Sequence, residues 1–364
     1  MKRFFCIALC ALLLTGCATT NAAPGSADSA TQAPATDAPA PAVAVTGSSP
    51  ITKDGTYTLT GVIDGQVLVT ASNVTLILDN AAITCADGSA ILGDDGDGQK
   101  SLQNLTVKLV GKSSVSGGAH GVQGKDNLTI TGDGSLDVTA VKDGLHAGDT
   151  LNFEGGTVNV LSSYEGVEAA YVNLLGGSLT THASDDGVNA ACDRDGVVPS
   201  VVISGGEHYI YSGSDGIDSN GTLDISGGTT FVLINAPRDG QTFDADIPGS
   251  FLPHLTLSGQ FSAGDTLAVA GFEVTLDTPV TAAALVLPGL ADGESYGVKL
   301  NGSDYRDVTA TVTVQPGFGG GFGGGNRGGA RPDFDGELPD FGERAPGDFG
   351  GGTRPGRGAP PPAT

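Results

Sequence analysis

Residues 151–168 read LNFEGGTVNVLSSYEGVE, and residues 172–189 read VNLLGGSLTTHASDDGVN. Aligned with each other, the two stretches share a strand-like start, a Gly-Gly pair, a second strand-like run, and an acidic residue followed by Gly and Val. Two successive copies of one pattern indicate a structural repeat, because each copy encodes the same strand–turn–strand unit. The fold of this chain is therefore predicted from the repeat.

The pattern extends in both directions along the chain. The Gly of the acidic turn falls at residues 121, 144, 166, 187 and 216, and the second Gly of the other turn at 134, 156, 177, 206 and 228. The steps are 21 to 23 residues, apart from one step of 29 in each series that places a single insertion around residues 191–200. Short alternating strands, Gly at the corners and a period of about 22 residues predict an all-β chain folded as a parallel β-helix.

The predicted β-helix domain covers residues 51–315. Weaker copies of the pattern begin near residue 73, and we expect residues 56–69 to form an N-terminal cap that closes the open end. The pattern fades after about residue 231, where residues 235–253 look like a loop. Five strand-like runs between residues 266 and 313 then predict antiparallel strands. We therefore expect final coils followed by a β-rich C-terminal cap.

The two ends of the chain differ from the repeat. Residues 1–16 combine a Lys-Arg start, a short apolar run and Leu14-Thr15-Gly16 before Cys17, which resembles the lipobox of a bacterial lipoprotein signal peptide. Cys17 is then the lipidated residue, and the protein is expected to be exported and anchored by lipid to the outer membrane or cell surface. Residues 17–50 are predicted to be an Ala/Pro/Thr-rich tether, and residues 316–364 a disordered Gly/Pro-rich tail.

The composition limits the possible partners. The 364 residues include 41 Asp plus Glu but only 17 Lys plus Arg, for a formal net charge of −24. Such a chain is a poor match for nucleic acid, whose binding requires neutralisation of phosphates, and it repels anionic partners unless a cation lies between. There is no Trp, so the flat aromatic row that often binds neutral sugars is missing. Cys85 and Cys192 lie several coils apart, and we expect two unpaired thiols.

The acidic corners form two columns when the coils are stacked. The column before the corner Gly contains His120, Asp143, Glu165, Asp186 and Asp215, and the column two residues after that Gly contains Gln123, His146, Glu168, Asn189 and Asp218. Between them, Val122, Leu145, Val167, Val188 and Ile217 are predicted to point inward.

Carboxylates stacked about 4.8 Å apart form a ladder in which each pair repels by on the order of 1 kcal/mol. We therefore expect a cation to bind among them. Oxygen ligands at flexible spacing favour Ca²⁺, and the best-supplied stretch contains Glu165, Glu168, Asp185, Asp186, Asn189, Asp215 and Asp218. The alternative is that these residues are plain Asp-Gly turns without a metal. His120 and His146 are expected to end the ladder as polar surface groups.

The runs Lys142-Asp143-Gly144-Leu145-His146-Ala147, Tyr164-Glu165-Gly166-Val167-Glu168 and Ser184-Asp185-Asp186-Gly187-Val188-Asn189 resemble the bacterial carbohydrate-binding β-helix proteins of the clostridial type. The resemblance covers roughly residues 50–315. It implies a right-handed, pectate-lyase-like β-helix that binds calcium and acidic polysaccharide of the polygalacturonate kind, and in some cases cellulose. It also places calcium ligands on the acidic corners, which adds Asp143 to the residues above.

Three functions remain open at this stage. The first is non-catalytic, calcium-dependent binding of acidic polysaccharide by a monomeric surface lipoprotein. The second is a polysaccharide lyase, for which only Lys142 and Arg194 are candidate bases near the acidic corner. The third is a structural surface protein or adhesin, in which the helix is a spacer and the tail makes the contacts. The scarcity of cations near the ladder makes an enzyme the weaker prediction.

Overall fold

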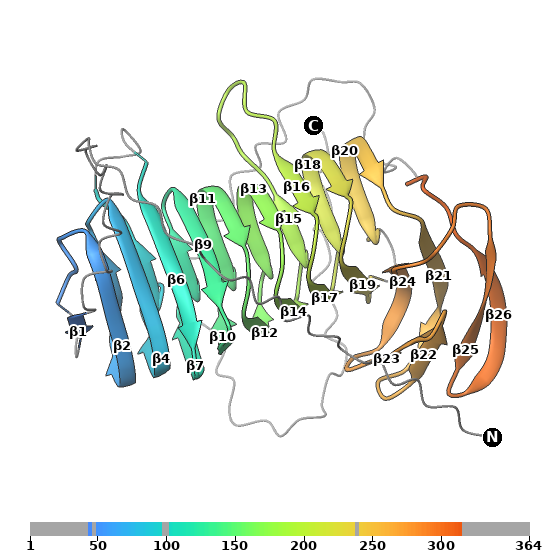
Figure 1. Ribbon diagram of the computed structural model, residues 1–364, viewed down its shortest axis with the longest axis horizontal. Helices are drawn as coiled ribbons and strands as arrows, with labels where there is room; N and C mark the ends of the chain where they lie inside the picture. Colours follow the sequence, from blue (N-terminus) through green and yellow to red (C-terminus); the bar gives the residue numbers. More distant parts are fainter. Residues whose placement is uncertain (1–42, 46–48, 97–101, 237–239, 315–364) are drawn as a thin grey trace, which may run out of the picture. The chain divides into compact units, whose positions relative to one another are not determined.

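The computed structural model describes residues 43–45, 49–96, 102–236 and 240–314, and these residues contain strands but no helix. They confirm the predicted fold class: a parallel β-helix of about 8 turns with about 23 residues per turn. Figure 1 shows the strands of successive turns side by side, in chain order from β2 to β20. Within the described residues there is no apolar helix long enough to cross a membrane.

Each turn of the helix has three strand positions, and each strand pairs in parallel with the strand at the same position of the neighbouring turn. The first side contains β2 (Gly55–Asp64), β4 (Asn73–Cys85), β6 (Asn104–Val110), β9 (Asn127–Gly132), β11 (Leu145–Phe153), β13 (Val167–Leu174), β16 (Ser200–Ile203), β18 (Ile217–Ile225) and β20 (Phe243–Phe251). The second side contains the later halves of β2 and β4 and then β7 (Lys112–Gly117), β10 (Ser135–Ala140), β12 (Thr157–Ser163), β14 (Ser178–Ala183), β17 (Glu207–Ser212) and β19 (Thr229–Ile234).

The third side carries the acidic corner. It contains β3 (Val67–Val69), β5 (Ile91–Gly93), β8 (Val122–Gly124) and β15 (Val188–Ala190), together with the first halves of β11, β13, β18 and β20. The irregular segment between β15 and β16 is the predicted insertion around residues 191–200. Because it lies between two sides, it lengthens one turn without shifting the register of the next.

Alternating apolar side chains fill the interior. The predicted inward column is confirmed: Val122, Leu145, Val167, Val188 and Ile217 are all fully buried and pair in register from one turn to the next. The helix buries apolar side chains of each turn against the turns above and below, which is how a solenoid obtains a core without a second layer. The same register aligns the polar residues on either side of this column into two rows along the helix.

The N-terminal end differs from the expectation. Residues 56–69 form the first full turn of the helix rather than a separate cap, because β2 pairs in parallel with β4 and β3 pairs in parallel with β5. β1 (Val43–Val45), which lies in the stretch expected to be a tether, pairs in parallel with β2. The remaining predictions for the signal peptide, the tether and the tail concern residues outside those that the structure describes.

The C-terminal end contains the expected antiparallel strands, but the loop predicted at residues 235–253 is wrong. That region forms β20, because Phe243 and Ala245 continue the inward positions of Ile217 and Ser219. β21 (His254–Phe261) pairs antiparallel with β24 (Val280–Val286), which also pairs antiparallel with β19. A separate antiparallel sheet follows, made of β22 (Thr266–Val269), β23 (Phe272–Thr275), β25 (Ser295–Leu300) and β26 (Ser303–Thr309).

Candidate functional site

The acidic corners stack directly on one another. The backbone N–H of Gly144 donates to the carbonyl of Glu165, that of Gly166 to Asp186, and that of Gly187 to Asp215, at 3.0 Å in each case. A Cβ at Gly187 would lie 2.2 Å from Ile210 Cγ2 and 2.7 Å from the carbonyl oxygen of Gly216. Glycine is therefore required here by the close approach of two coils, and this approach holds the acidic side chains at a fixed spacing.

The structure brings most of the predicted ligands together in two groups. Within each group the ligand atoms lie within 4.8 Å of one another. The first group is Asp143, Glu165 and Glu168, and the second is Asp186, Asp215 and Asp218. Asn189 lies between them and donates its side-chain amide to Glu165 Oε2 at 3.1 Å. The two groups and Asn189 thus form one acidic ladder along the corner.

Asp185 does not join either group. Its carboxylate accepts a hydrogen bond from Tyr164, and this bond raises the pKa of the Tyr164 hydroxyl to about 12. The Asp186 carboxylate accepts the backbone N–H of Asp215 at 2.9 Å, and Asp215 in turn accepts that of Gln241 at 2.5 Å. These carboxylates therefore cap the next coil as well as facing the ladder, as the plain-turn alternative requires.

Burial and mutual repulsion make the ladder costly to ionise. Burial, followed by the charge of Glu168, raises the pKa of Glu165 to about 10. Burial also raises the pKa of Asp186 and of Asp218 to about 7, assisted by the charge of Asp185 on Asp186 and of Asp186 on Asp218. A divalent cation among these oxygens would remove the repulsion and take the place of the protons.

The second acidic group fits a hard cation. Asp186, Asp215 and Asp218 offer only oxygen, and the amide oxygen of Asn189 is buried with no hydrogen-bond partner among the described residues. The ion pairs of Lys112 with Asp137 and of Lys299 with Asp304 lie away from the ladder. An oxygen-only cluster of one buried and two half-buried carboxylates, with an unsatisfied amide oxygen beside it, has the donor chemistry that Ca²⁺ prefers.

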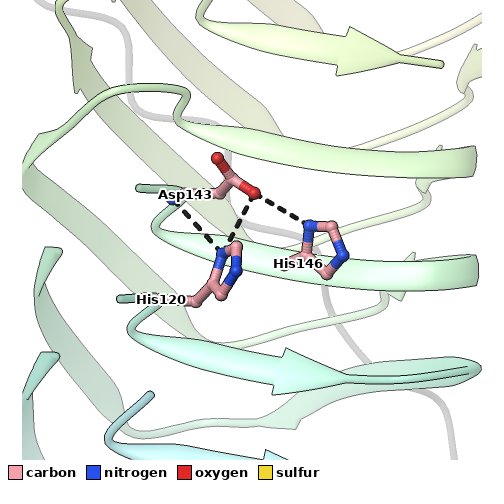
Figure 2. Close-up of side chains that lie close together, drawn as sticks. All are labelled: His120, Asp143 and His146. Carbon is pink, nitrogen blue, oxygen red and sulfur yellow. Dashed lines mark hydrogen bonds and ion pairs between the residues drawn. The ribbon is translucent and has the colours of Figure 1, made fainter. Parts of the chain in front are cut away.

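Two histidines lie at the other end of the ladder, and the expectation that they are surface groups is wrong. Figure 2 shows His120, Asp143 and His146 converging on each other across adjacent coils. The Nδ1 atoms of His120 and His146 lie 3.0 and 2.8 Å from the same oxygen of Asp143, Oδ2. His120 and Asp143 are buried and His146 is half-buried, because the histidines follow the same register as the carboxylates of the ladder.

The protonation of this group is unequal. Burial lowers the pKa of His120 and outweighs its hydrogen bond to Asp143. Burial also acts to lower the pKa of His146, but hydrogen bonds to Asp143 and Glu168 reverse the effect and raise it to about 9. The two imidazoles hold the pKa of Asp143 well below its usual range, although burial alone would raise it. Asp143 is therefore a buried carboxylate in its ionised form.

Asp244 extends the ladder and was not found from the sequence. It pairs in register with Asp218, and its charge contributes to the raised pKa of Asp218. The turn between them differs from the repeat: Thr242 takes the place of the corner Gly, and 26 residues separate the two acids. The only available signal was an Asp two residues after a polar position, which is too weak to identify without the register.

Arg194, one of the two candidate lyase bases, is held by residues outside the second acidic group. Arg194 forms an ion pair with Asp149 and also contacts the carbonyl of Gly148. The nearby thiol of Cys192 accepts a hydrogen bond from the Arg194 Nε–H, and Cys85 and Cys192 are both free, as expected. Lys142 is exposed. Arg194 is thus engaged by a carboxylate outside the predicted ligand set.

The tyrosines of the second side pack against other rings. Tyr211 is buried and stacks on His182, with ring centroids 4.7 Å apart, and Tyr209 stacks on Phe231 at 5.0 Å. Both line an open cleft of about 250 Å³ next to β23, together with Glu273 and Asp277. The cleft is shallow and polar, so it offers no continuous aromatic platform for a sugar ring.

Comparisons with known proteins address the family. Residues 47–248 match the family model described as carbohydrate-binding domain-containing protein. Among solved structures, the chain is similar to the polysaccharide lyase-like protein from C. thermocellum, in its gadolinium derivative, with 22% identity and a TM-score of 0.49. That similarity covers 55% of this chain and 86% of the other chain. No curated protein matches. Because the family model covers more than half of the sequence and includes the turns that carry the acidic ladder, this chain belongs to the family of carbohydrate-binding domain-containing proteins.

Proposed function

We propose that the protein binds an acidic polysaccharide of the polygalacturonate kind without cleaving it, through calcium held on the acidic ladder. The observation that carries the proposal is the group of Asp186, Asp215 and Asp218, whose carboxylate oxygens converge within 4.8 Å on one corner of a carbohydrate-binding fold. A protein with a net charge of −24 repels a uronate polymer unless a cation bridges the two sets of carboxylates.

The ladder residues would have different roles according to their position on the corner. Asp186 and Asp215 use part of their oxygens to cap backbone amides, which fixes their orientation. Asn189 and Asp218 belong to the column two residues after the corner Gly and pair with each other in register. They would hold the ion from the side that faces the polysaccharide. The cation supplies positive charge at this corner, and the chain supplies a rigid row of oxygens with the spacing of the coils.

Non-catalytic binding is favoured over lyase activity by the placement of Arg194. A lyase requires a base that takes the proton next to the uronate carboxylate. The guanidinium of Arg194 instead forms an ion pair with Asp149. In this proposal a lipid anchor at Cys17 and the tether of residues 17–50 hold the domain at the membrane surface and leave the β-helix free to reach a polymer.

Calorimetric titration of the protein with polygalacturonate, with Ca²⁺ and after chelation, tests this function. We expect binding with Ca²⁺ and none after chelation, and Asp218→Asn should weaken it by on the order of 10-fold, equivalent to about 1.4 kcal/mol. Asp304→Asn is the matched control, because Asp304 is an exposed acid of the separate C-terminal sheet.

Three results would contradict the proposal. Binding that persists after chelation would show that calcium does not bridge the protein and the polysaccharide. A rise in absorbance from unsaturated uronate during the titration would make the protein a lyase and direct attention to Lys142. Absence of binding to both polygalacturonate and a neutral glucan would favour the spacer or adhesin role, with contacts made by the tail.

A further inference from the structure

The N-terminal end of the ladder has a different donor chemistry from the rest. His120, Asp143 and His146 bring two imidazole nitrogens and a carboxylate oxygen within 4.8 Å of one another, whereas the Asp186 group contains oxygen alone. Ca²⁺ takes oxygen ligands, and imidazole suits Zn²⁺ and its first-row neighbours. The two ends of the ladder are therefore suited to different metals.

The contacts within this cluster converge on a single oxygen atom of Asp143. The backbone N–H of Asp143 donates to His120 Nδ1 at 3.4 Å, so this nitrogen presents a lone pair to its surroundings. The same atom lies 3.0 Å from Asp143 Oδ2, which also carries lone pairs and is already 2.8 Å from His146 Nδ1. Two imidazole nitrogens thus share one carboxylate oxygen, and a metal ion would take the place of the protons that join them.

A second observation points to the same conclusion. Asp143 is fully buried, and its other oxygen, Oδ1, has no hydrogen-bond partner among the described residues. An ionised carboxylate deprived of water and with one oxygen unsatisfied is costly, by several kcal/mol per buried charge, unless a positive charge is close. In the described part of the chain the ion-pair partners of Asp143 are the two histidines, both at Oδ2, so Oδ1 has no positive partner.

We propose that His120, Asp143 and His146 form a binding site for a divalent transition metal of the Zn²⁺ class, separate from the calcium site of the proposed function. Tetrahedral ligands 2.0–2.2 Å from one ion lie about 3.3–3.6 Å apart, so the 3.0 and 2.8 Å separations seen here would widen by less than about 1 Å to admit an ion. Coordination through Nδ1 leaves the proton of each ring on Nε2.

Glu168 supplies the fourth ligand. Its Oε2 lies 3.7 Å from His146 Nδ1, and it is adjacent to His146 in the register of the coils. Two histidines and two carboxylates complete a tetrahedral set, as structural Zn²⁺ sites require. Asp143 then belongs to this metal, and calcium is left to the carboxylates that follow along the ladder. A metal here would tie three adjacent coils together.

Titration of the full chain with Zn²⁺ alone tests the site, with Co²⁺ as a spectroscopic probe. We expect one Zn²⁺ to bind with an affinity that excess Ca²⁺ does not reduce, and Co²⁺ to give the intense visible spectrum of a tetrahedral site. His146→Gln and His120→Gln should each lower the affinity for Zn²⁺ by about 100-fold or more. Mutation of residues outside the coordination sphere already lowers metal affinity by about 10- to 100-fold. His182→Gln is the matched control, because His182 stacks on Tyr211 on another side of the helix.

The proposal fails if the wild type binds no Zn²⁺, if both histidine variants bind it as the wild type does, or if Ca²⁺ displaces it. A thiolate charge-transfer band with Co²⁺ would assign the ion to cysteine and overturn it as well. If His120→Gln does not retain the β-sheet circular dichroism of the wild type, the half-buried His146 provides the decisive variant. Loss of Zn²⁺ binding with intact calcium-dependent polysaccharide binding would separate the two sites.

Discussion

At the scale of the residue, the interior of the β-helix disfavours a charged side chain, as His208 shows. His208 is fully buried, and its Nε2 donates to the carbonyl of Gly205 at 2.8 Å, while Nδ1 has no partner among the described residues. The ring lies edge-on to Phe153. A protonated imidazole would have a second N–H without an acceptor in this position, so burial lowers the pKa of His208 to about 4.

His208 is therefore predicted to make the protein sensitive to acid. Between pH 6.5 and pH 4 the unfolded chain takes up a proton at His208 that the folded chain does not, so stability falls as the pH falls through this window. From pH 7 to pH 4, the wild type should lose about 3 kcal/mol more than His208→Gln, as a shift of two to three pKa units implies. Urea unfolding of both proteins at several pH values measures the difference, and parallel pH profiles would refute the prediction.

At the scale of the strand, one rung is stabilised by its two neighbours. Leu145 at the start of β11 pairs in register with Val122 below and Val167 above, and all three are fully buried. The strand has no other layer against which to pack, since a solenoid is one sheet wound around its own core. Loss of side-chain volume in the middle of the stack leaves a cavity that both adjacent coils must share.

Leu145→Ala is expected to lower the free energy of unfolding by about 3 kcal/mol, within the range observed for buried Leu to Ala changes. Leu161→Ala removes the same atoms from an exposed position of β12 and should change it by less than about 0.5 kcal/mol. Urea denaturation followed by circular dichroism provides both values. Equal effects of the two substitutions would mean that the core does not limit stability at this rung.

At the scale of the whole molecule, the charge limits which partners the β-helix can meet, and the N-terminal sequence predicts where it is held. The acidic groups cluster on one corner, and the net charge of −24 keeps anionic surfaces away unless a cation mediates. Residues 1–17, which lie outside the described residues, carry the lipobox-like motif. Attachment there would place the carbohydrate-binding domain beyond a stretch of about thirty residues rich in Ala and Pro.

Cys17→Ser is predicted to release the protein from the membrane. The substitution removes the sulfur to which a diacylglyceryl group would attach, while the β-helix begins far downstream and should fold unchanged. Fractionation of a bacterial host that expresses each form, followed by immunoblotting, provides the measurement. Cys192→Ser is the control, because Cys192 is a free thiol in the insertion between β15 and β16. Membrane attachment of the Cys17→Ser variant would contradict the lipoprotein prediction.

The sequence by itself determined the parts of this protein that repeat. In a parallel β-helix each coil stacks in register on the one before, so a column in the aligned sequence becomes a row in space. For that reason the inward row from Val122 to Ile217, the corner glycines and the acidic rows were predictable. The same reasoning placed Asp186, Asp215 and Asp218 in one predicted stretch of seven ligands, and the ligand atoms of these three lie within 4.8 Å of one another.

Only the tertiary structure decided what departs from the repeat. The first and last turns are less regular in sequence, so the turn at residues 56–69 and β20 were recognised only by their pairing with adjacent coils. The direction of a side chain depends on its rotamer and neighbours as well as on its column. The convergence of His120 and His146 on Asp143, the contact of Asp185 with Tyr164 and the ion pair of Arg194 with Asp149 therefore emerged only when the coils were packed together.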